Sequence, residues 1–473
     1  MAAVATTNNL SHMPLPSPRS LLPTTRLPAI PSAHGDQQLA LQFQLDRTQW
    51  WTAAELETAQ LRSLRTLVGH ARETTQYYRE RFNQAGMGDT TNMDAAAWLR
   101  VPVSRRRELQ KAGEGLFSTR PPAAHGKVVA ATTSGSTGQP LRFARNDVTM
   151  TYWRAFTLRD LVWHDEDTLP KIGAIRYAPV GHAQAPHGVT SPHWNNSVAV
   201  TFPTGPAVML NVSSSLDEQL DWLERERPQR LNSFPSNFLA LAEHARRTGR
   251  TLPGIGRLRS VGEMLTPEAR ATIAEAWGGK VVDLYSCEEA GYLALECPEH
   301  GNYHVQAENV KLEILDEQDN PCPPGTPGRV VITSLHNFAS PLIRMDLGDY
   351  AELGEPCPCG RGLPVIRRIL GRSRNRLFLP NGETRYPRVG EKAIADAAKG
   401  VTVFRFHCIQ HSLEMVEVQI VASRAFDGDE QVRLAKSIQD NLGHPFRITF
   451  SFPADIPAQP NGKRETFVSL VHA

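Results

Sequence analysis

The sequence has no run of about eighteen or more apolar residues, because Arg, Asp, Glu or Pro interrupts every candidate stretch, so no membrane-spanning helix is expected. It also lacks an excess of charge of either sign, since 51 Lys and Arg residues stand against 49 Asp and Glu residues. A surface that binds nucleic acid usually carries a clear positive excess. We therefore expect a soluble protein with small-molecule partners, and with neither nucleic acid nor membrane among them.

Acidic side chains are missing before Asp36, and this proline-rich stretch contains no apolar segment long enough for a secretory signal. Its composition predicts a disordered tail over residues 1–40. An organellar transit peptide is the open alternative, because such leaders are poor in acid and contain serine. Cysteines are few, six in all, and without a secretory signal a reducing compartment, the cytoplasm, is expected. There, clustered cysteines indicate metal binding before disulfides.

The chain is too long, at 473 residues, for one hydrophobic core, so a large domain and a smaller one are expected. A helix is predicted after Thr52, which has capping-box spacing with Glu55. Between about residues 125 and 350, β-branched segments alternate with helical stretches, which predicts an α/β domain on a largely parallel sheet. The expected strands include 127–131, 198–202, 280–284 and 330–333, and the expected helices include 215–226 and 266–277.

A separate block of about a hundred residues follows Gly371 and Arg372, with an alternating apolar pattern at 413–420 that indicates a strand. We interpret this block as a small α+β domain. The predicted organisation is a tail at 1–40, a large domain at 41–371 and a small C-terminal domain at 372–473.

Glycines and hydroxyls are concentrated in residues 132–140, Thr-Thr-Ser-Gly-Ser-Thr-Gly-Gln-Pro, directly after a predicted strand. Glycines let backbone N–H groups approach a phosphate, and hydroxyls donate further hydrogen bonds to it. The Walker A pattern is absent, because no Gly-Lys-Ser/Thr follows, so a P-loop NTPase is not supported. For this segment taken alone, a solvated Ser/Gly turn is the alternative.

Sulfur and imidazole ligands for a metal are supplied by two separate segments. Cys357 and Cys359 stand one residue apart, and Cys297 is followed by His300 and His304. Three soft sulfurs and one histidine make the four ligands of a closed tetrahedral Zn²⁺ site. A structural zinc joining two loops is therefore predicted, with buried metal-free thiols as the alternative. Four protein ligands leave no open position, which argues against a catalytic zinc.

Five segments, in the same order along the chain, resemble the motifs of the adenylate-forming ligases. They are 132–140, 262–263 with 283–291, 341–349, Gly371-Arg372 and Pro460-Asn461-Gly462-Lys463. The match runs from about residue 45 to the C-terminus. The motifs Leu-Ile-Arg-x-x-x-Gly-Asp at 342–349 and Cys-x-Cys-Gly-Arg at 357–361 are most similar to those of the phenylacetate-CoA ligase branch. In that branch the zinc-type histidine aligns with His304, which favours it over His300.

The resemblance implies an α/β fold with a large N-terminal adenylate-forming-ligase domain and a small, mobile α+β C-terminal domain that rotates about the hinge at Gly371-Arg372. It also implies an AMP-forming acid–thiol ligase. Such an enzyme would use ATP and Mg²⁺ to convert a small carboxylic acid, with an aromatic acid favoured, into an acyl-adenylate. The acyl group would then pass to coenzyme A.

The resemblance also implies roles for individual residues. Glu289 would hold Mg²⁺ against the phosphates, and Asp349 would accept hydrogen bonds from the ribose, with Arg372 nearby. Tyr285 would lie near the adenine. Lys463 would place a positive charge between the substrate carboxylate and the α-phosphate, where negative charge grows in the transition state. The other nucleotide-binding positions would be Thr133, Ser134, Gly135, Ser136, Thr137, Gly138, Gly262 and Glu263.

Three positions depart from the family pattern: Glu288 replaces a Thr, Arg374-Asn375 replaces an Asp pair, and Gln139 replaces a frequent Lys. These departures bear on the thioester-forming step more than on adenylation, because the hinge governs rotation of the small domain. Two alternatives stay open, an enzyme that delivers the acyl group to an amine or carrier protein and a noncatalytic nucleotide-binding homologue. The sequence names neither the acid nor the oligomeric state, a homodimer included.

Overall fold

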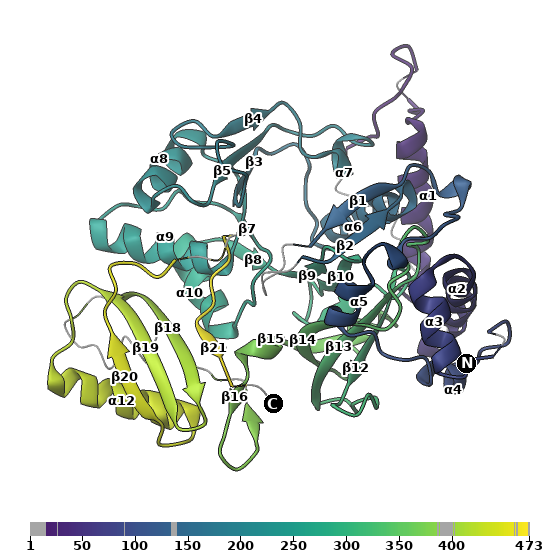
Figure 1. Cartoon of the computed structure of the whole chain (residues 1–473). Coiled ribbons are helices and arrows are strands. Elements are labelled where there is room, and N and C mark those ends of the chain that lie inside the picture. The colour runs from purple at the N-terminus through teal and green to yellow at the C-terminus, as the bar shows by residue number, and fades with distance from the viewer. Residues whose placement is uncertain are drawn as a thin grey trace, which may run out of the picture.

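The chain folds into a large N-terminal unit and a smaller C-terminal unit (Figure 1). The large unit ends with strand β15 (Val365–Arg372), and the small unit follows it. The computed structural model describes residues 16–25, 27–88, 90–133, 140–385, 387, 401, 403–457, 459 and 462–471. This arrangement confirms the predicted architecture, a large unit of helices and sheets followed by a small unit of helix and strands. Within the described ranges, no helix combines the length and the hydrophobicity needed to cross a bilayer.

Helices dominate the first part of the large unit. They are α1 (Ala33–Thr48), α2 (Ala53–Thr74), α3 (Gln76–Gln84), α4 (Ala95–Leu99) and α5 (Arg106–Ala112), followed by the 3₁₀ turns η2 (Gly113–Leu116) and η3 (Ala123–His125). Helix α2 begins where the sequence predicts, because Thr52 and Glu55 form a capping box. Its buried face, which includes Leu64, Leu67 and Val68, lies in the largest hydrophobic cluster of the large unit.

The prediction of a disordered tail over 1–40 is wrong for residues 33–40, which form the first half of α1. The Ser32 side chain caps this helix by accepting a hydrogen bond from the Gly35 N–H at 3.2 Å. Gln38 is buried and donates to the carbonyl oxygens of Arg154 and Ser197, each at 2.8 Å. Tertiary hydrogen bonds to distant segments therefore order a stretch whose composition alone predicts disorder.

A mainly parallel sheet forms one half of the large unit, in the order β4-β5-β3-β6-β7-β8. Only β4, at the edge, pairs antiparallel. The strands are β3 (Ile172–Arg176), β4 (Val189–Ser191), β5 (Ala207–Asn211), β6 (Arg230–Ser233), β7 (Arg257–Ser260) and β8 (Lys280–Val282), and the helices after β5, β6 and β7 are α8 (Leu216–Glu226), α9 (Pro235–Thr248) and α10 (Pro267–Trp277). The helices predicted at 215–226 and 266–277 are confirmed, with Ser215 and Thr266 as N-caps.

The second half of the large unit is an antiparallel sheet in the order β12-β13-β14-β15-β11-β10-β9. Its strands are β9 (Leu284–Cys287), β10 (Gly291–Glu296), β11 (Tyr303–Val305), β12 (Val310–Leu315), β13 (Pro327–Ser334), β14 (Met345–Leu353) and β15. The expectation of a largely parallel sheet up to residue 350 is therefore wrong after β8. No helix separates these strands, and a parallel pair needs a crossover connection long enough to hold one.

The predicted strand at 198–202 is also wrong, because this segment contains the short helix α7 (Asn196–Ala199). The Asn195 side chain caps it by accepting from the Ser197 N–H at 3.0 Å. Val198 and Phe202 both pack into one cluster with Trp194. The apolar residues thus recur every four positions, as they do on one face of a helix. The Asn195 cap stabilises the helical start, although the β-branched composition favours a strand.

A hairpin precedes the parallel sheet and brackets the segment rich in glycine and hydroxyls. Strands β1 (Val129–Thr132) and β2 (Arg142–Arg145) pair antiparallel, and α6 (Asp147–Trp163) follows them. Residues 134–139, which join the two strands, lie outside the described residues. The hairpin brings the two ends of that segment together, because Thr133 and Leu141 exchange hydrogen bonds.

The C-terminal unit has its own hydrophobic core. Residues of β18, β19 and α12, such as Cys408, Val418 and Ile438, pack together in it. The sheet order is β20-β19-β18-β21, and its elements are β18 (Val403–Ser412), β19 (Met415–Ala422), α12 (Gly428–Leu442), β20 (Arg447–Ser451) and β21 (Phe467–Ser469), after the turn η4 (Ser373–Asn375) and the hairpin β16 (Leu377–Phe378) and β17 (Thr384–Arg385). In Figure 1 this unit, in yellow-green, occupies one corner of the molecule. The strand predicted at 413–420 corresponds to β19.

Candidate active site

Three side chains from the antiparallel sheet meet at one carboxylate. Asp349 of β14 lies opposite Arg372 of β15 in the sheet register. Its carboxylate accepts a hydrogen bond from the Tyr285 hydroxyl at 2.7 Å and pairs with Nε of Arg372 at 2.9 Å. The two contacts use different carboxylate oxygens, so the group is held in one orientation while each oxygen keeps a lone pair for a ligand.

The electrostatics of this group follow from burial and from the carboxylate charge. Burial, and then the charge of Asp349, raises the pKa of Tyr285 well above its ordinary value, so its hydroxyl remains a donor. The same carboxylate raises the pKa of Arg372. A neutral donor and a permanent cation therefore flank Asp349.

Lys463 belongs to the C-terminal unit but lies against the large unit. Gly262, which follows β7, has φ +77°, and a Cβ there would lie 3.2 Å from Cε and 3.5 Å from Nζ of Lys463. Glycine at this position leaves room for the lysine side chain and tolerates the left-handed backbone. The sequence predicts both residues as part of one site, and the structure brings them together.

Glu263 fastens the backbone next to Lys463. Its carboxylate accepts a hydrogen bond from the N–H of Arg464 at 2.7 Å and two from Ser236, whose N–H and hydroxyl each lie at 3.0 Å. Burial raises the pKa of Glu263 despite these donors. Glu263 therefore joins the N-terminal end of α9 to the loop that carries the lysine.

The ammonium of Lys463 interacts with charges of the large unit. Burial, followed by repulsion from Arg372, lowers the pKa of Lys463, while Asp349 and Glu263 raise it. A cation in such a partly dehydrated place acts on nearby negative charge more strongly than one in bulk water. The site thus combines Lys463 with two arginines, Arg372 and Arg176, and with the carboxylates of Asp349 and Glu263.

Glu289 and Thr133 are connected by an arginine that the sequence analysis missed. The guanidinium of Arg106 pairs with Oε1 of Glu289 at 3.0 Å and donates to Oγ1 of Thr133. Glu289 is buried, as is Thr133. Arg106 therefore holds the start of the segment rich in glycine and hydroxyls next to the acidic residue.

A sequence signal for Arg106 exists. Arg105, Arg106 and Arg107 stand at the start of α5, where cations oppose the helix dipole. A run of arginines at a helix N-terminus therefore indicates that their side chains pair with acidic groups from other parts of the chain. Arg105, for example, pairs with Asp346 at 2.8 Å and with Asp319 at 2.9 Å.

Five of the predicted nucleotide-binding residues, Ser134, Gly135, Ser136, Thr137 and Gly138, lie outside the described residues. The same holds for Gln139, Pro460 and Asn461. Of the departures from the family pattern, Glu288 pairs with Arg145 at 2.6 Å. Its extra charge is therefore balanced by a neighbouring cation.

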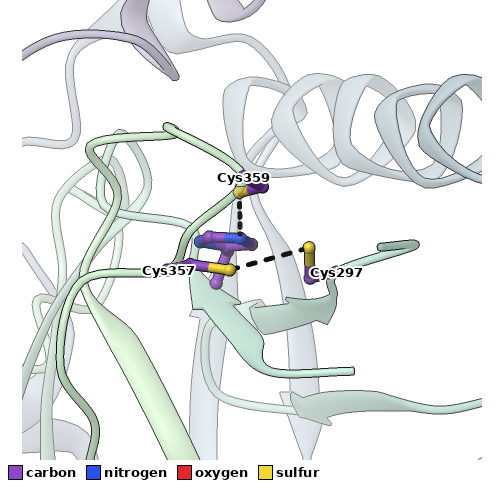
Figure 2. Close-up of side chains that lie close together, drawn as sticks. Cys297, Cys357 and Cys359 are labelled. Carbon is purple, nitrogen blue, oxygen red and sulfur yellow. Dashed lines mark hydrogen bonds between the residues drawn. The ribbon is translucent and has the colours of Figure 1, made fainter. Parts of the chain in front are cut away.

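The predicted zinc ligands form one cluster beside β10, β11 and the turn before β15. Cys297, His304, Cys357 and Cys359 each offer one ligand atom, and all these atoms lie within 4.8 Å of one another. Figure 2 shows the three cysteine side chains around one centre, with Sγ of Cys357 3.9 Å from Sγ of Cys297. Sγ of Cys359 lies 3.3 Å from Nε2 of His304. Ligand atoms around a tetrahedral zinc are separated by roughly 3.3–3.8 Å, so these two pairs lie near that separation, and three sulfurs with one imidazole are ligand types that zinc takes.

The surroundings of His304 suit a metal ligand. Burial, followed by the positive charge of Arg361, lowers the pKa of His304 to about 4, so the imidazole is neutral at physiological pH, as metal binding requires. The rings of Trp163 and His304 are nearly perpendicular, with their centroids 5.6 Å apart. His300 is exposed and does not belong to the cluster.

The geometry defines a class of protein in which a parallel sheet, an antiparallel sheet and a lysine loop from a small C-terminal unit enclose one site. The family described as "AMP-binding enzyme" matches residues 40–340, and the one described as "CapK C-terminal domain" matches residues 384–469. The chain belongs to the AMP-binding enzyme family.

Curated relatives match most of the chain. The phenylacetate-coenzyme A ligase of Thermus thermophilus is 24% identical over 447 residues, which cover 88% of this chain and 97% of the relative. The phenylacetate-coenzyme A ligase of Pseudomonas putida is 24% identical over 390 residues, which cover 80% of this chain and 84% of the relative.

Solved structures share the fold at low identity. A 2-hydroxyisobutyryl-CoA ligase in the postadenylation state has a TM-score of 0.68 and 19% identity, covering 89% of this chain and 90% of that one. The same ligase in the thioesterification state has a TM-score of 0.56 and 20% identity over the same shares. The anthranilate CoA ligase AuaEII has a TM-score of 0.52 and 16% identity, covering 72% of this chain and 66% of that one.

Proposed function

We propose that the protein uses ATP to convert a small carboxylic acid, an aromatic one by preference, into an acyl-adenylate and then transfers the acyl group to coenzyme A. The observation that carries this proposal is the position of Lys463, packed against Gly262 and within electrostatic reach of Asp349 and Arg372. A lysine placed beside this carboxylate–arginine pair suits a reaction in which negative charge grows between two anionic substrates.

Asp349 binds the ribose of the nucleotide in this proposal. Tyr285 and Arg372 already fix the carboxylate, so little rotational freedom is lost when a sugar hydroxyl donates to it. Tyr285, whose hydroxyl is committed to Asp349, offers its ring to the base.

Lys463 supplies the positive charge at the reacting atoms. The carboxylate oxygen of the substrate attacks the α-phosphorus of ATP, the bond from that phosphorus to the bridging oxygen breaks, and pyrophosphate leaves with the electron pair. The lysine ammonium, aimed at the oxygens that gain charge, stabilises that transition state.

Glu289 fits magnesium, which prefers oxygen ligands. Its Oε1 is paired with Arg106, so Oε2 is the atom that would bind the ion. Bound there, the ion would offset the negative charge of the phosphates. Arg106, which also contacts Thr133, would hold that threonine beside them.

The cysteine and histidine cluster holds a structural zinc in this proposal. The cluster lies between β10, β11 and the turn before β15, and its residues are far from Lys463 in the sequence. Protein atoms supply all four ligands of a tetrahedral ion. The ion would join two loops of the large unit.

We place the boundary between the large and the small domain between residues 371 and 372.

Coenzyme A is favoured as the acceptor, because the two curated relatives are named as coenzyme A ligases and this chain matches 97% and 84% of their lengths. Transfer to an amine or a carrier protein is the alternative. The experiment that separates them incubates the protein with ATP, Mg²⁺ and a panel of aromatic and aliphatic acids. Acyl-CoA together with AMP, identified by mass spectrometry, supports the proposal. An adenylate that reacts with amines but leaves coenzyme A unchanged supports the alternative, and no adenylate from any acid contradicts both.

Replacing Asp349 with alanine is expected to weaken ATP binding by about tenfold to a hundredfold, because hydrogen bonds to a charged acceptor are lost. The substitution also leaves the buried Tyr285 hydroxyl and Arg372 without their partner, so the melting temperature is expected to fall, and the affinity is measured at a temperature at which the variant is folded. Isothermal titration with ATP measures the affinity, and Asp440→Ala on α12 is the control. Equal nucleotide affinity in the Asp349 variant would remove this residue from the site.

A further inference from the structure

Arg176 ends β3, an inner strand of the parallel sheet, beside the loop that carries Lys463. Its carbonyl oxygen accepts a hydrogen bond from the Val212 N–H at 2.9 Å. A Cβ on Gly462 would lie 2.8 Å from Cγ1 of Val212 and 3.6 Å from Cβ of Tyr177. Ligands of open α/β sheets bind outside the carboxyl ends of the parallel strands. Arg176 therefore stands at the edge of the candidate active site.

The Arg176 side chain belongs to the face of the parallel sheet that is turned toward α6. Successive side chains of a strand point to opposite faces. Ile175 packs on one face, in the cluster formed with α8, α9 and α10. Ile172 packs on the other face, in the cluster that contains residues of α6. Positions 172, 174 and 176 share this second face, so Arg176 is directed away from the helices α8, α9 and α10.

The charge of Arg176 acts on two groups of the site. The first is Tyr292 of β10, whose hydroxyl lies 3.1 Å from the Thr157 hydroxyl on α6. Burial raises the pKa of Tyr292, and the charge of Arg176 opposes that rise. The second group is Lys463, whose pKa is lowered by burial and then by its neighbouring cations, Arg372 and Arg176. The guanidinium is thus within electrostatic reach of both the lysine and the α6 side of the sheet.

Arg176 forms no ion pair within the ranges that the structure describes. The acidic groups on the α6 side are held by Arg259, which pairs with Asp160 and, at 3.1 Å, with Glu166. The two carboxylates beside the lysine are engaged as well, one by an arginine and the other by three hydrogen-bond donors. A cation at the ligand-binding edge of the sheet is therefore left for an anion that a ligand supplies.

We propose that Arg176 binds a second anionic group of the acid, so that the substrates are carboxylic acids that carry a further carboxylate; this rests on the function proposed above and names its class of acid. The reacting carboxylate lies at Lys463, and the second carboxylate lies at the guanidinium of Arg176. A guanidinium and a carboxylate form two parallel charge-assisted hydrogen bonds, which orient the acid as well as bind it. The added negative charge also offsets the repulsion between the two cations.

The test measures acid-dependent exchange of labelled pyrophosphate into ATP with matched acids. Benzoate is compared with isophthalate and terephthalate, phenylacetate with 4-carboxyphenylacetate, and butyrate with glutarate. Carboxamide analogues of the diacids separate charge from size. The wild type is expected to show at least about tenfold higher kcat/KM for the diacid of the preferred pair than for its monoacid and its carboxamide.

Arg176→Gln is expected to lower kcat/KM for that diacid by about tenfold to a hundredfold, because charge-assisted hydrogen bonds are lost. Its kcat/KM for the monoacid and its KM for ATP should each stay within about twofold. Arg176→Lys keeps the charge and should retain part of the preference. Arg176→Glu should reverse it, so that 4-(aminomethyl)benzoate, which carries an ammonium group, is preferred over terephthalate.

The matched control is Arg246→Gln on α9, where the arginine is exposed and pairs with Glu243 of the same helix. It should leave the preference among acids and the KM for ATP unchanged. Melting temperatures of all variants identify any loss of folding, and the reversed preference in Arg176→Glu is a gain that loss of folding does not produce.

Three results would overturn the inference. The first is a wild type that uses monoacids as well as the diacids. The second is a higher KM for ATP in Arg176→Gln, which would assign the guanidinium to the phosphates of the nucleotide. The third is an equal loss for monoacid and diacid, which would show a role at the reacting carboxylate or in the fold. Exchange with monoacids alone leaves the proposed function intact, whereas a wild type that supports exchange with no acid overturns the function and the inference together.

Discussion

Lys463→Ala is expected to slow formation of the acyl-adenylate by about 10²–10³-fold, because a preorganised positive charge at the transition state is lost. Its contacts with Gly262 and its electrostatic coupling to Asp349 place the ammonium inside the site in this orientation. The thioester-forming step uses the other orientation of the small domain. The variant supplied with presynthesised acyl-adenylate should therefore form acyl-CoA at close to the wild-type rate.

Rapid-quench measurement of both half-reactions checks this expectation, with Lys436→Ala on α12 as the control for loss of a lysine from the same unit. The control should behave as the wild type in both steps. Adenylation at the wild-type rate in Lys463→Ala would mean that the lysine has no part in the chemistry and that the proposed rotation of the small domain is wrong for this chain.

Cys357→Ser/Cys359→Ser is expected to abolish zinc binding and to lower the melting temperature by roughly 5 °C or more, since closed four-ligand sites contribute directly to folding. The purified wild type should contain about one zinc per chain, measured by inductively coupled plasma mass spectrometry. The two serines keep the size of the side chains but remove the soft ligands that zinc prefers.

Cys322→Ser is the matched control, because Cys322 is buried but lies outside the cluster. It should keep the zinc. A chelator should destabilise the wild type and the control, and have no further effect on the double variant. A wild type that is metal-free and fully stable would contradict the zinc prediction and favour buried thiols.

The parts of the site that lie in contiguous motifs could be predicted from the sequence. Asp349 and Lys463 each lie in a motif whose order along the chain indicates the same reaction, and the structure pairs Asp349 with Arg372 and packs Lys463 against Gly262. The zinc-type cluster could be predicted as well, because ligand chemistry requires these residue types whatever fold brings them together.

Contacts between distant segments could not be predicted in this way. Arg106 reaches Glu289 across 183 positions of sequence, and the bond of Gln38 to Arg154 that orders α1 spans 116. The antiparallel register of Asp349 with Arg372 depends on how β14 and β15 pair. At 198–202 a local pattern was misleading because the cap at Asn195 outweighs β-branched composition. In each case tertiary context decides the outcome.

The central claim, that this protein adenylates a carboxylic acid, is tested most directly by exchange of labelled pyrophosphate into ATP. Exchange requires that the first half-reaction run in both directions, and it needs no coenzyme A. The account predicts exchange that depends on one or more acids of the panel, that is absent without acid, and that falls by about 10²–10³-fold in Lys463→Ala. No acid-dependent exchange by the folded, ATP-binding protein, or formation of ADP and phosphate in its place, would contradict it.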